Sequence, residues 1–109
     1  RYCRAQNSFL AYIRDDAENG WIQSNMNVTD LWWVGATDWN TGTWIWSYDF
    51  SPLNYTKWKK GEPNAYNGTE ENCCNMYYDG EWNDRNCTHE LPFVCKDTER
   101  KISLKRTKE

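Results

Sequence analysis

The sequence lacks any run of apolar residues long enough to cross a bilayer, so we predict no membrane insertion by this stretch of chain. It also lacks a signal peptide at its start, Arg1-Tyr2-Cys3, which favours a mature or excised piece of a larger protein. Histidine is nearly absent. His89 is the only one and has no serine or cysteine nucleophile near it in the sequence, so we predict that the chain is not an enzyme.

Aliphatic side chains are scarce for a chain of 109 residues, a length that fits one domain only. Eight Trp, seven Tyr and three Phe supply the apolar bulk among many polar residues. Because such a small core is rarely sufficient by itself, we expect covalent staples, and five cysteines are available to form them.

Basic charge is scarce in the first 95 residues, where 7 basic and 13 acidic side chains give a net −6. This acidic body excludes nucleic acid as a partner and is compatible with a hard cation. The remaining segment has 6 basic and 3 acidic side chains, a net +3, and no apolar face. We therefore predict a domain over residues 1–95 and a charged linker or flexible tail over residues 96–109.

Two features indicate an extracellular location, either as a secreted protein or as an ectodomain. The cysteine density is high for a cytosolic protein, because reducing conditions there discourage disulfides. The short chain also holds four Asn-x-Thr sequons. The last of them has cysteine at its centre and is a poor acceptor. The candidate glycosylation sites are Asn27, Asn54, Asn67 and Asn86.

The residue pattern predicts short elements separated by loops. Residues 3–13 read as the end of a helix running into a strand. A second helix begins at Asp15, because Glu18 follows as in a capping box, and ends near Asn27 with Trp21, Ile22 and Met26 on its apolar face. Strands are expected over residues 31–36, 43–47, 73–78 and 92–95, with a turn at Asp79-Gly80. Residues 48–72 form a long loop of the kind that is usually functional.

The long loop carries Glu62-Pro63-Asn64 and then Glu71, two residues before Cys73, and Trp82-Asn83-Asp84 and Cys87 follow it. Together with Trp33-Val34-Gly35-Ala36 and Cys95, these residues resemble the sugar-binding members of the C-type lectin family across most of the chain. The resemblance implies an α+β fold in which two helices flank small antiparallel sheets, with a long Ca²⁺-binding loop and disulfide staples. It also implies that the family's first strand and part of its first helix are missing.

The resemblance implies one Ca²⁺ site. Ca²⁺ takes about 6–8 oxygen ligands, and carboxylates and amides supply them. The expected metal ligands are Glu62, Asn64, Glu71, Asn83 and Asp84. A second site is predicted to be impaired: Asp38 resembles one of its ligands, but Asn72 stands where an Asp is usual.

The same residues predict how a sugar is held. A carboxylate only accepts hydrogen bonds, whereas an amide also donates, so Glu62 with Asn64 and Glu71 with Asn83 form two acceptor–donor pairs for neighbouring hydroxyls. By resemblance, the order Glu-Pro-Asn goes with mannose, glucose, N-acetylglucosamine or fucose, and Pro63 follows a cis peptide bond. We expect Tyr66 to pack against the bound sugar.

The family's pairings imply the disulfides Cys3–Cys95 and Cys73–Cys87 and leave Cys74 unassigned. Three alternatives stay open for Cys74: a buried inert thiol, a bond to a cysteine outside this fragment or in another chain, and exchange with Cys73 as the partner of Cys87.

The leading hypothesis is Ca²⁺-dependent binding of glycans or glycoproteins by a module of a secreted or cell-surface protein. Single sugar sites bind weakly, so useful binding needs several copies, brought together by regions outside this chain or by Cys74. The alternative is a protein-binding domain of the same fold in which Ca²⁺ only stabilises the loops.

Overall fold

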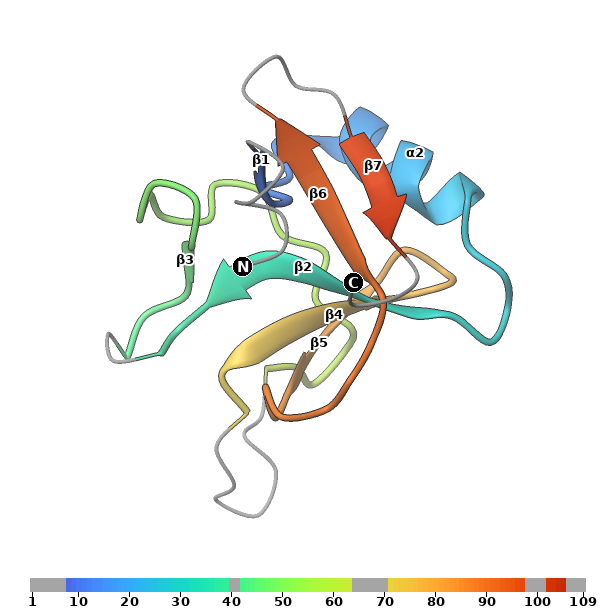
Figure 1. Ribbon diagram of the computed structural model, residues 1–109. Coiled ribbons are helices and arrows are strands. Elements are labelled where there is room, and N and C mark those ends of the chain that lie inside the picture. Colours follow the sequence, from blue (N-terminus) through green and yellow to red (C-terminus); the bar gives the residue numbers. More distant parts are fainter. Residues whose placement is uncertain (1–7, 40–41, 64–70, 98–101, 106–109) are drawn as a thin grey trace.

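The computed structural model of the chain describes residues 8–39, 42–63, 71–97 and 102–105 (Figure 1). One α-helix and seven β-strands are described, and they follow one another along the chain as β1 (Ser8–Leu10), α2 (Asp16–Ser24), β2 (Leu31–Thr37), β3 (Ile45–Trp46), β4 (Cys73–Tyr77), β5 (Trp82–Arg85), β6 (Phe93–Asp97) and β7 (Ile102–Lys105). The first expected helix falls on residues outside the described ranges.

The seven strands form one mixed sheet, rather than several small antiparallel ones, in the order β1-β6-β2-β4-β5. Strand β3 pairs with β2, and β7 pairs with β6. All pairs are antiparallel except that of β2 with β6, which meet at Trp33 and Phe93. Residues Trp32, Val34, Gly35 and Ala36 of β2 are buried, as expected for a strand at the centre of a sheet.

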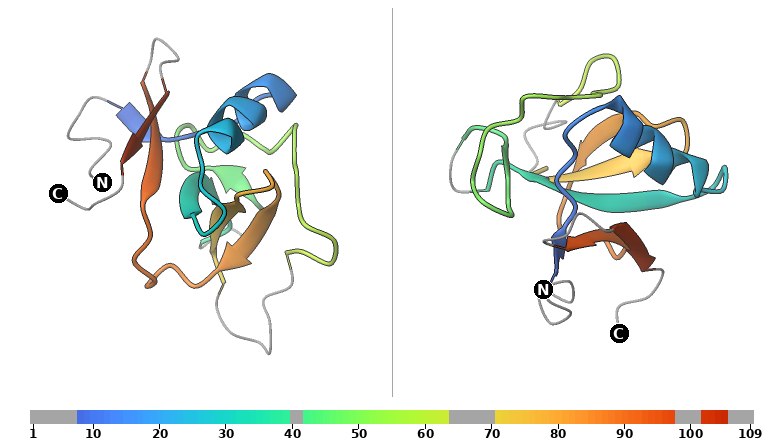
Figure 2. Two further views of the ribbon diagram at one scale, coloured as in Figure 1. Left: turned by 90° about the vertical axis from the view of Figure 1, so that its right-hand side faces the viewer. Right: turned by 90° about the horizontal axis from the view of Figure 1, so that it is seen from above.

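Helix α2 lies along one side of β2 and β4 (Figure 2). Its start is confirmed: the side chain of Asp15 accepts a hydrogen bond from the backbone N–H of Glu18 at 2.9 Å. Glu18 in turn accepts from the N–H of Arg14 at 2.8 Å, one residue beyond the usual capping-box donor. The helix ends at Ser24, with Asn25 as its C-cap, slightly earlier than predicted.

The prediction for Trp21 is wrong, because this side chain is 47% exposed. Ile22 is fully buried, and Met26 packs against the core from just beyond the helix. Positions four apart share a helix face, whereas adjacent positions do not, so burying Ile22 turns Trp21 toward solvent.

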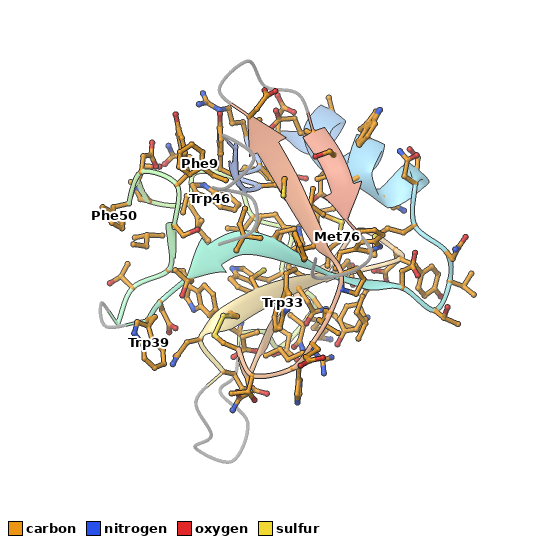
Figure 3. All side chains as sticks on the ribbon, viewed as in Figure 1. Phe9, Trp33, Trp39, Trp46, Phe50 and Met76 are labelled. Carbon is orange, nitrogen blue, oxygen red and sulfur yellow. A yellow bond between two sulfur atoms is a disulfide. The ribbon has the colours of Figure 1, made fainter. Side chains whose placement is uncertain are left out.

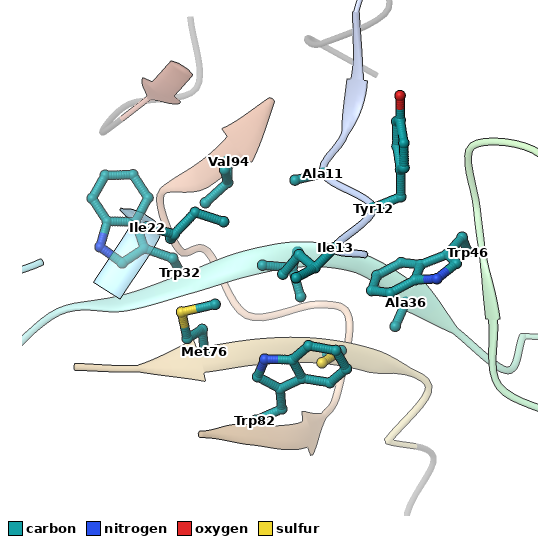
Figure 4. Close-up of a cluster of buried hydrophobic side chains, with 12 residues drawn as sticks. Ala11, Tyr12, Ile13, Ile22, Trp32, Ala36, Trp46, Met76, Trp82 and Val94 are labelled. Carbon is teal, nitrogen blue, oxygen red and sulfur yellow. The ribbon is translucent and has the colours of Figure 1, made fainter. Parts of the chain in front are cut away.

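Aromatic rings supply much of the core, and Trp82 is one of its fully buried members (Figure 4). Its ring meets those of Trp46, Trp58 and Tyr55 edge to face, with centroids 5.7–6.0 Å apart. The indole N–H donates to Asn19 Oδ1 at 2.9 Å, and Asn19 Nδ2 donates to the Gly80 carbonyl at 2.8 Å. These bonds join β5, α2 and the β4–β5 turn, so the one polar group of the Trp82 ring is satisfied.

The C-terminal segment departs from the predicted linker or flexible tail, because residues 102–105 form β7 along β6. Cys95 pairs with Leu10 of β1 and with Ser103 of β7, so β7 occupies the edge of β6 opposite β1. A strand edge exposes unpaired N–H and C=O groups, and pairing with β7 satisfies them. Ile102 also packs against the core. Strand β3 is shorter than the predicted residues 43–47.

Candidate functional site

The β4–β5 hairpin positions the last two predicted ligands. Asn83 lies opposite Asn75, and Asp84 lies opposite Cys74. Neighbouring residues on a strand point to opposite faces, so Asp84, which is 1% exposed, shares the buried face with Trp82, and Asn83 is half-buried on the other face. The hairpin register therefore separates the side chains of Asn83 and Asp84.

The segment before Pro63 runs beside the start of β5. Trp58 and Trp82 form a parallel bridge, in which Lys59 N–H donates to the Trp82 carbonyl and Trp82 N–H donates to the Lys57 carbonyl, both at 2.8 Å. The two segments therefore run in the same direction where they meet, and the chain turns directly after Lys59. There Glu62 N–H donates to the Lys59 carbonyl at 2.9 Å, and the Glu62–Pro63 peptide bond is cis, as the resemblance predicts.

Glu71 lies at the entrance to β4, close to a disulfide. Cys73 and Cys87 are bonded, with their Cα atoms 5.2 Å apart, so the predicted pairing is confirmed and the exchange of Cys74 for Cys73 is excluded. The bond fixes the ends of β4 and β5 together, two residues from Glu71. Cys95 is also disulfide-bonded, and its expected partner Cys3 falls outside the described residues.

Cys74 is a free thiol with no exposed surface. Burial, and then the negative charge of Asp84, raise the pKa of this thiol well above its usual value, so it stays protonated. A protonated, buried thiol is a poor nucleophile and a poor metal ligand. The structure therefore favours the inert thiol among the alternatives for Cys74.

A second acidic side chain, Asp38, lies near Asp84. Burial raises the pKa of Asp38, and the negative charge of Asp84 raises it further. A hydrogen bond to the backbone of Asp38 itself lowers this pKa, but the net shift is upward. Within the described ranges, one carboxylate oxygen of Asp38 is buried without a hydrogen-bond partner. Two neighbouring acids, of which Asp84 is buried and Asp38 is half-buried, are an arrangement that a cation stabilises.

Thr37 connects Asp38 to the loop that carries Glu71. Its hydroxyl donates to the Asn72 carbonyl at 2.6 Å and accepts from the backbone N–H of Trp39 at 3.1 Å. Thr37 is not among the residues predicted from the sequence, although a polar β-branched side chain at the end of a buried strand is a visible signal. Trp39 is 53% exposed and lies at the edge of the molecule beyond Thr37 (Figure 3).

The predicted ligands are thus only partly placed. Glu62, Glu71, Asn83 and Asp84 come from segments joined by the parallel bridge, the hairpin and the disulfide, whereas Asn64, Tyr66 and Asn67 fall outside the described residues. In the part of the chain that is described, no three carboxylate, imidazole or thiol side chains gather closely enough to hold a metal ion. All the predicted donors are oxygens, which is the chemistry that Ca²⁺ requires.

The family model described as "Lectin C-type domain" matches residues 1–97, and the chain belongs to this family. A hepatic lectin from Gallus gallus is 33% identical over 96 residues, which are 86% of this chain and 45% of that protein. A perlucin-like protein from Mytilus galloprovincialis is 30% identical over 103 residues, which are 87% of this chain and 65% of that protein. The chain therefore spans between about half and two thirds of the length of these relatives.

Solved structures confirm the C-type lectin fold. The carbohydrate-recognition domain of the mouse scavenger receptor C-type lectin matches with a TM-score of 0.79 and 28% identity, over 99% of this chain and 79% of that one. The carbohydrate-recognition domain of cow CD23, studied in the presence of a GlcNAc2Man3 oligosaccharide, matches with a TM-score of 0.78 and 32% identity. The match covers 94% of this chain and 74% of that one. A calcium-independent type II antifreeze protein, 22% identical with a TM-score of 0.74 over 95% and 74%, shares the fold, so the fold alone does not decide Ca²⁺ dependence.

Among the described residues, no helix is long and apolar enough to cross a membrane.

Proposed function

We propose that this domain binds carbohydrate in a Ca²⁺-dependent manner through Glu62, Asn64, Glu71, Asn83 and Asp84. The observation that carries the proposal is the carboxylate of Asp84, which is 1% exposed and lies close enough to Asp38 for its charge to raise the pKa of that acid. Two neighbouring acids are an arrangement that a cation stabilises, and oxygen donors of this kind suit Ca²⁺.

The proposed ligands are mannose-type sugars with neighbouring equatorial hydroxyls, on glycans or glycoproteins outside the cell. Bound Ca²⁺ supplies direct coordination to two such hydroxyls. The chain's own residues supply the orientation: Glu62 and Glu71 accept hydrogen bonds from the hydroxyls, while Asn64 and Asn83 donate to them. Similarity to lectins, including a domain studied with a mannose-containing oligosaccharide, supports this assignment.

Affinity chromatography tests the proposal. We expect the secreted domain to be retained on mannose–agarose in Ca²⁺ and released by EDTA. Glu71→Gln should abolish retention, because it removes one carboxylate from the ion, whereas the matched Glu90→Gln, at an exposed position, should not. The sugar assignment would be contradicted if the wild-type protein passed through the column in Ca²⁺ and bound no free neutral sugar.

The second candidate is a protein-binding domain in which Ca²⁺ only stabilises the loops. The exposed aromatic side chains of Trp21, Trp39 and Phe50 favour it, because aromatic residues are enriched at protein interfaces. Ca²⁺ binding measured by calorimetry, together with no response to any glycan on an array, would select this candidate.

A further inference from the structure

A cavity of about 310 Å³ lies between the segment that joins β1 to α2 and the loop that follows β3. Tyr12 and Arg14 line it from the first segment, Trp46 lines it from the end of β3, and Asp49 and Tyr55 line it from the loop. None of the proposed Ca²⁺ ligands belongs to its walls. Ligand pockets usually measure about 300–1,000 Å³, so this cavity suits a single sugar-sized ring.

Three aromatic side chains form fixed walls. Tyr12 and Trp46 are 6% and 5% exposed, and Figure 4 shows both side chains at the edge of the core. Tyr12 stacks on Tyr48 with ring centroids 4.4 Å apart, and the Tyr55 hydroxyl donates a hydrogen bond to Asp16. Because these rings are held by other contacts, the cavity is formed before any ligand enters.

Polar groups of opposite kinds stand around the rings. The Arg14 guanidinium lies 5.0 Å from the centre of the Tyr12 ring and can only donate hydrogen bonds. The Asp49 carboxylate accepts from Ser51 N–H at 3.0 Å and from Ser51 Oγ at 2.6 Å, and these bonds lower its pKa and keep it charged. A donor and an acceptor beside aromatic rings match an uncharged sugar ring that carries hydroxyl and acetamide groups.

Asn54 also lines the cavity, and it is the acceptor residue of the sequon Asn54-Tyr55-Thr56. It lies exposed in a bend, so a glycan on its side chain begins at the mouth of the cavity. We propose that the cavity seats the first N-acetylglucosamine of an N-linked glycan on Asn54. When the glycan is attached, Asn54 Nδ2 loses a proton and bonds to C1 of the sugar. The bond from C1 to the pyrophosphate of the lipid-linked glycan donor breaks in the same step.

The tether explains why modest contacts suffice. A covalently attached sugar faces the cavity at an effective concentration on the order of millimolar, so no high affinity is needed to keep it seated. The other described sequons lack this arrangement. Asn27 lines no part of the cavity, and Asn86 Oδ1 is engaged by Thr88 N–H at 2.9 Å and Thr88 Oγ1 at 2.7 Å.

Trimming the glycan in two ways tests the proposal on protein secreted by mammalian cells held at the high-mannose stage. Endoglycosidase H leaves one N-acetylglucosamine on each asparagine, whereas peptide N-glycosidase F removes every sugar. We expect the first product to keep the Tm of the intact protein and the second to lose about 4 °C or more, the shift expected for the loss of a few contacts in a domain of this size. The acetyl methyl resonance of the seated sugar should also shift away from its position in the free sugar, because aromatic rings lie beside it.

Matched variants identify the sequon. Thr56→Ala, which removes the sequon and keeps Asn54, should reproduce the loss of Tm, whereas Thr29→Ala, which removes the sequon at Asn27, should not. Equal Tm values for the two variants, or an unmodified Asn54 in the intact mass, would overturn the proposal. If micromolar free N-acetylglucosamine saturated the Thr56→Ala protein, the cavity would be a site for a free sugar rather than for a tethered one. That result would also overturn the proposal. Measuring each Tm in EDTA as well as in Ca²⁺ separates the effect of the glycan on Asn54 from the proposed Ca²⁺-dependent sugar binding.

Discussion

The side chain of Lys96 shows how one buried charge organises its surroundings. Its ammonium group has no exposed surface, donates to Glu18 Oε2 at 2.5 Å and to the Tyr12 carbonyl at 3.1 Å, and lies 3.9 Å from the centre of the Tyr12 ring. Because Glu18 also completes the cap of α2, the pair joins β6, the helix and the segment after β1. The two charges are tolerated in the interior because each has a partner.

Removing Glu18 should leave the buried ammonium of Lys96 without an opposite charge. We expect Glu18→Ala to lower the free energy of unfolding by about 3–5 kcal/mol, as is typical for a broken buried pair. The exposed ion pair of Lys57 with Asp16, at 3.8 Å, provides the control, and Lys57→Ala should change stability by about 1 kcal/mol or less. Urea denaturation of the variants measures the difference, and equal losses for the two would contradict this account of Lys96.

Phe50 combines a left-handed backbone, with φ of 64°, and a side chain that is 75% exposed (Figure 3). A side chain at this φ is strained by about 1–2 kcal/mol, and glycine is not. We expect Phe50→Gly to be about 0.5–1 kcal/mol more stable than Phe50→Ala, since both variants lose the ring and only glycine relieves the strain. Thermal unfolding of the two variants gives the comparison, and an alanine variant as stable as the glycine variant would show that no strain exists.

At the scale of elements, the sequence predicts what local rules control. The cap of α2 depends on neighbours three residues apart, and β2 is an apolar run between polar segments, so both were found. Strand β7 was missed because its alternation covers only Ile102–Lys105 and is surrounded by charge. The strand forms because it pairs with the edge of β6. No local sequence pattern reveals that this edge is available.

Deleting β7 tests what it contributes. We expect a chain that ends at Asp97 to lose about 1–2 kcal/mol of unfolding free energy, because Ile102 leaves the core and the edge of β6 is uncovered. It should also self-associate, since an open strand edge pairs with other chains. Denaturation and light scattering measure both effects, with a chain ending at Lys105 as the control. If both truncated chains match the full chain, β7 contributes nothing to stability.

At the scale of the whole molecule, contacts distant in sequence create the sites. The disulfide and the cis-proline were predictable only because the motifs resemble a family, since spacing alone does not fix either one. The pairing of Trp58 with Trp82, which holds the segment before Glu62 beside the start of β5, has no local signature. The same holds for the cavity that joins Tyr12 to Asn54, because only the folded chain brings these segments together.

Ca²⁺ should stabilise the whole domain if the proposed site exists. A ligand that binds only the folded state at 100 times its Kd adds about 2.7 kcal/mol to the unfolding free energy. We therefore expect EDTA to lower the Tm of the wild-type protein and to leave the Tm of Glu71→Gln nearly unchanged. Mg²⁺ should replace Ca²⁺ poorly, because it demands a stricter octahedral geometry. A wild-type Tm that is identical in Ca²⁺ and in EDTA would contradict the metal site.

The pairing of β6 with both β1 and β7 has a mechanical consequence. Ser8, at the outer end of β1, lies opposite Asp97, whereas Lys105, at the outer end of β7, lies opposite Phe93. A force applied through both ends of this segment therefore pulls at opposite ends of β6 and loads the flanking hydrogen bonds in shear, all at once. When such a domain is stretched, it yields only after several bonds break together, rather than one by one as in an opening zipper.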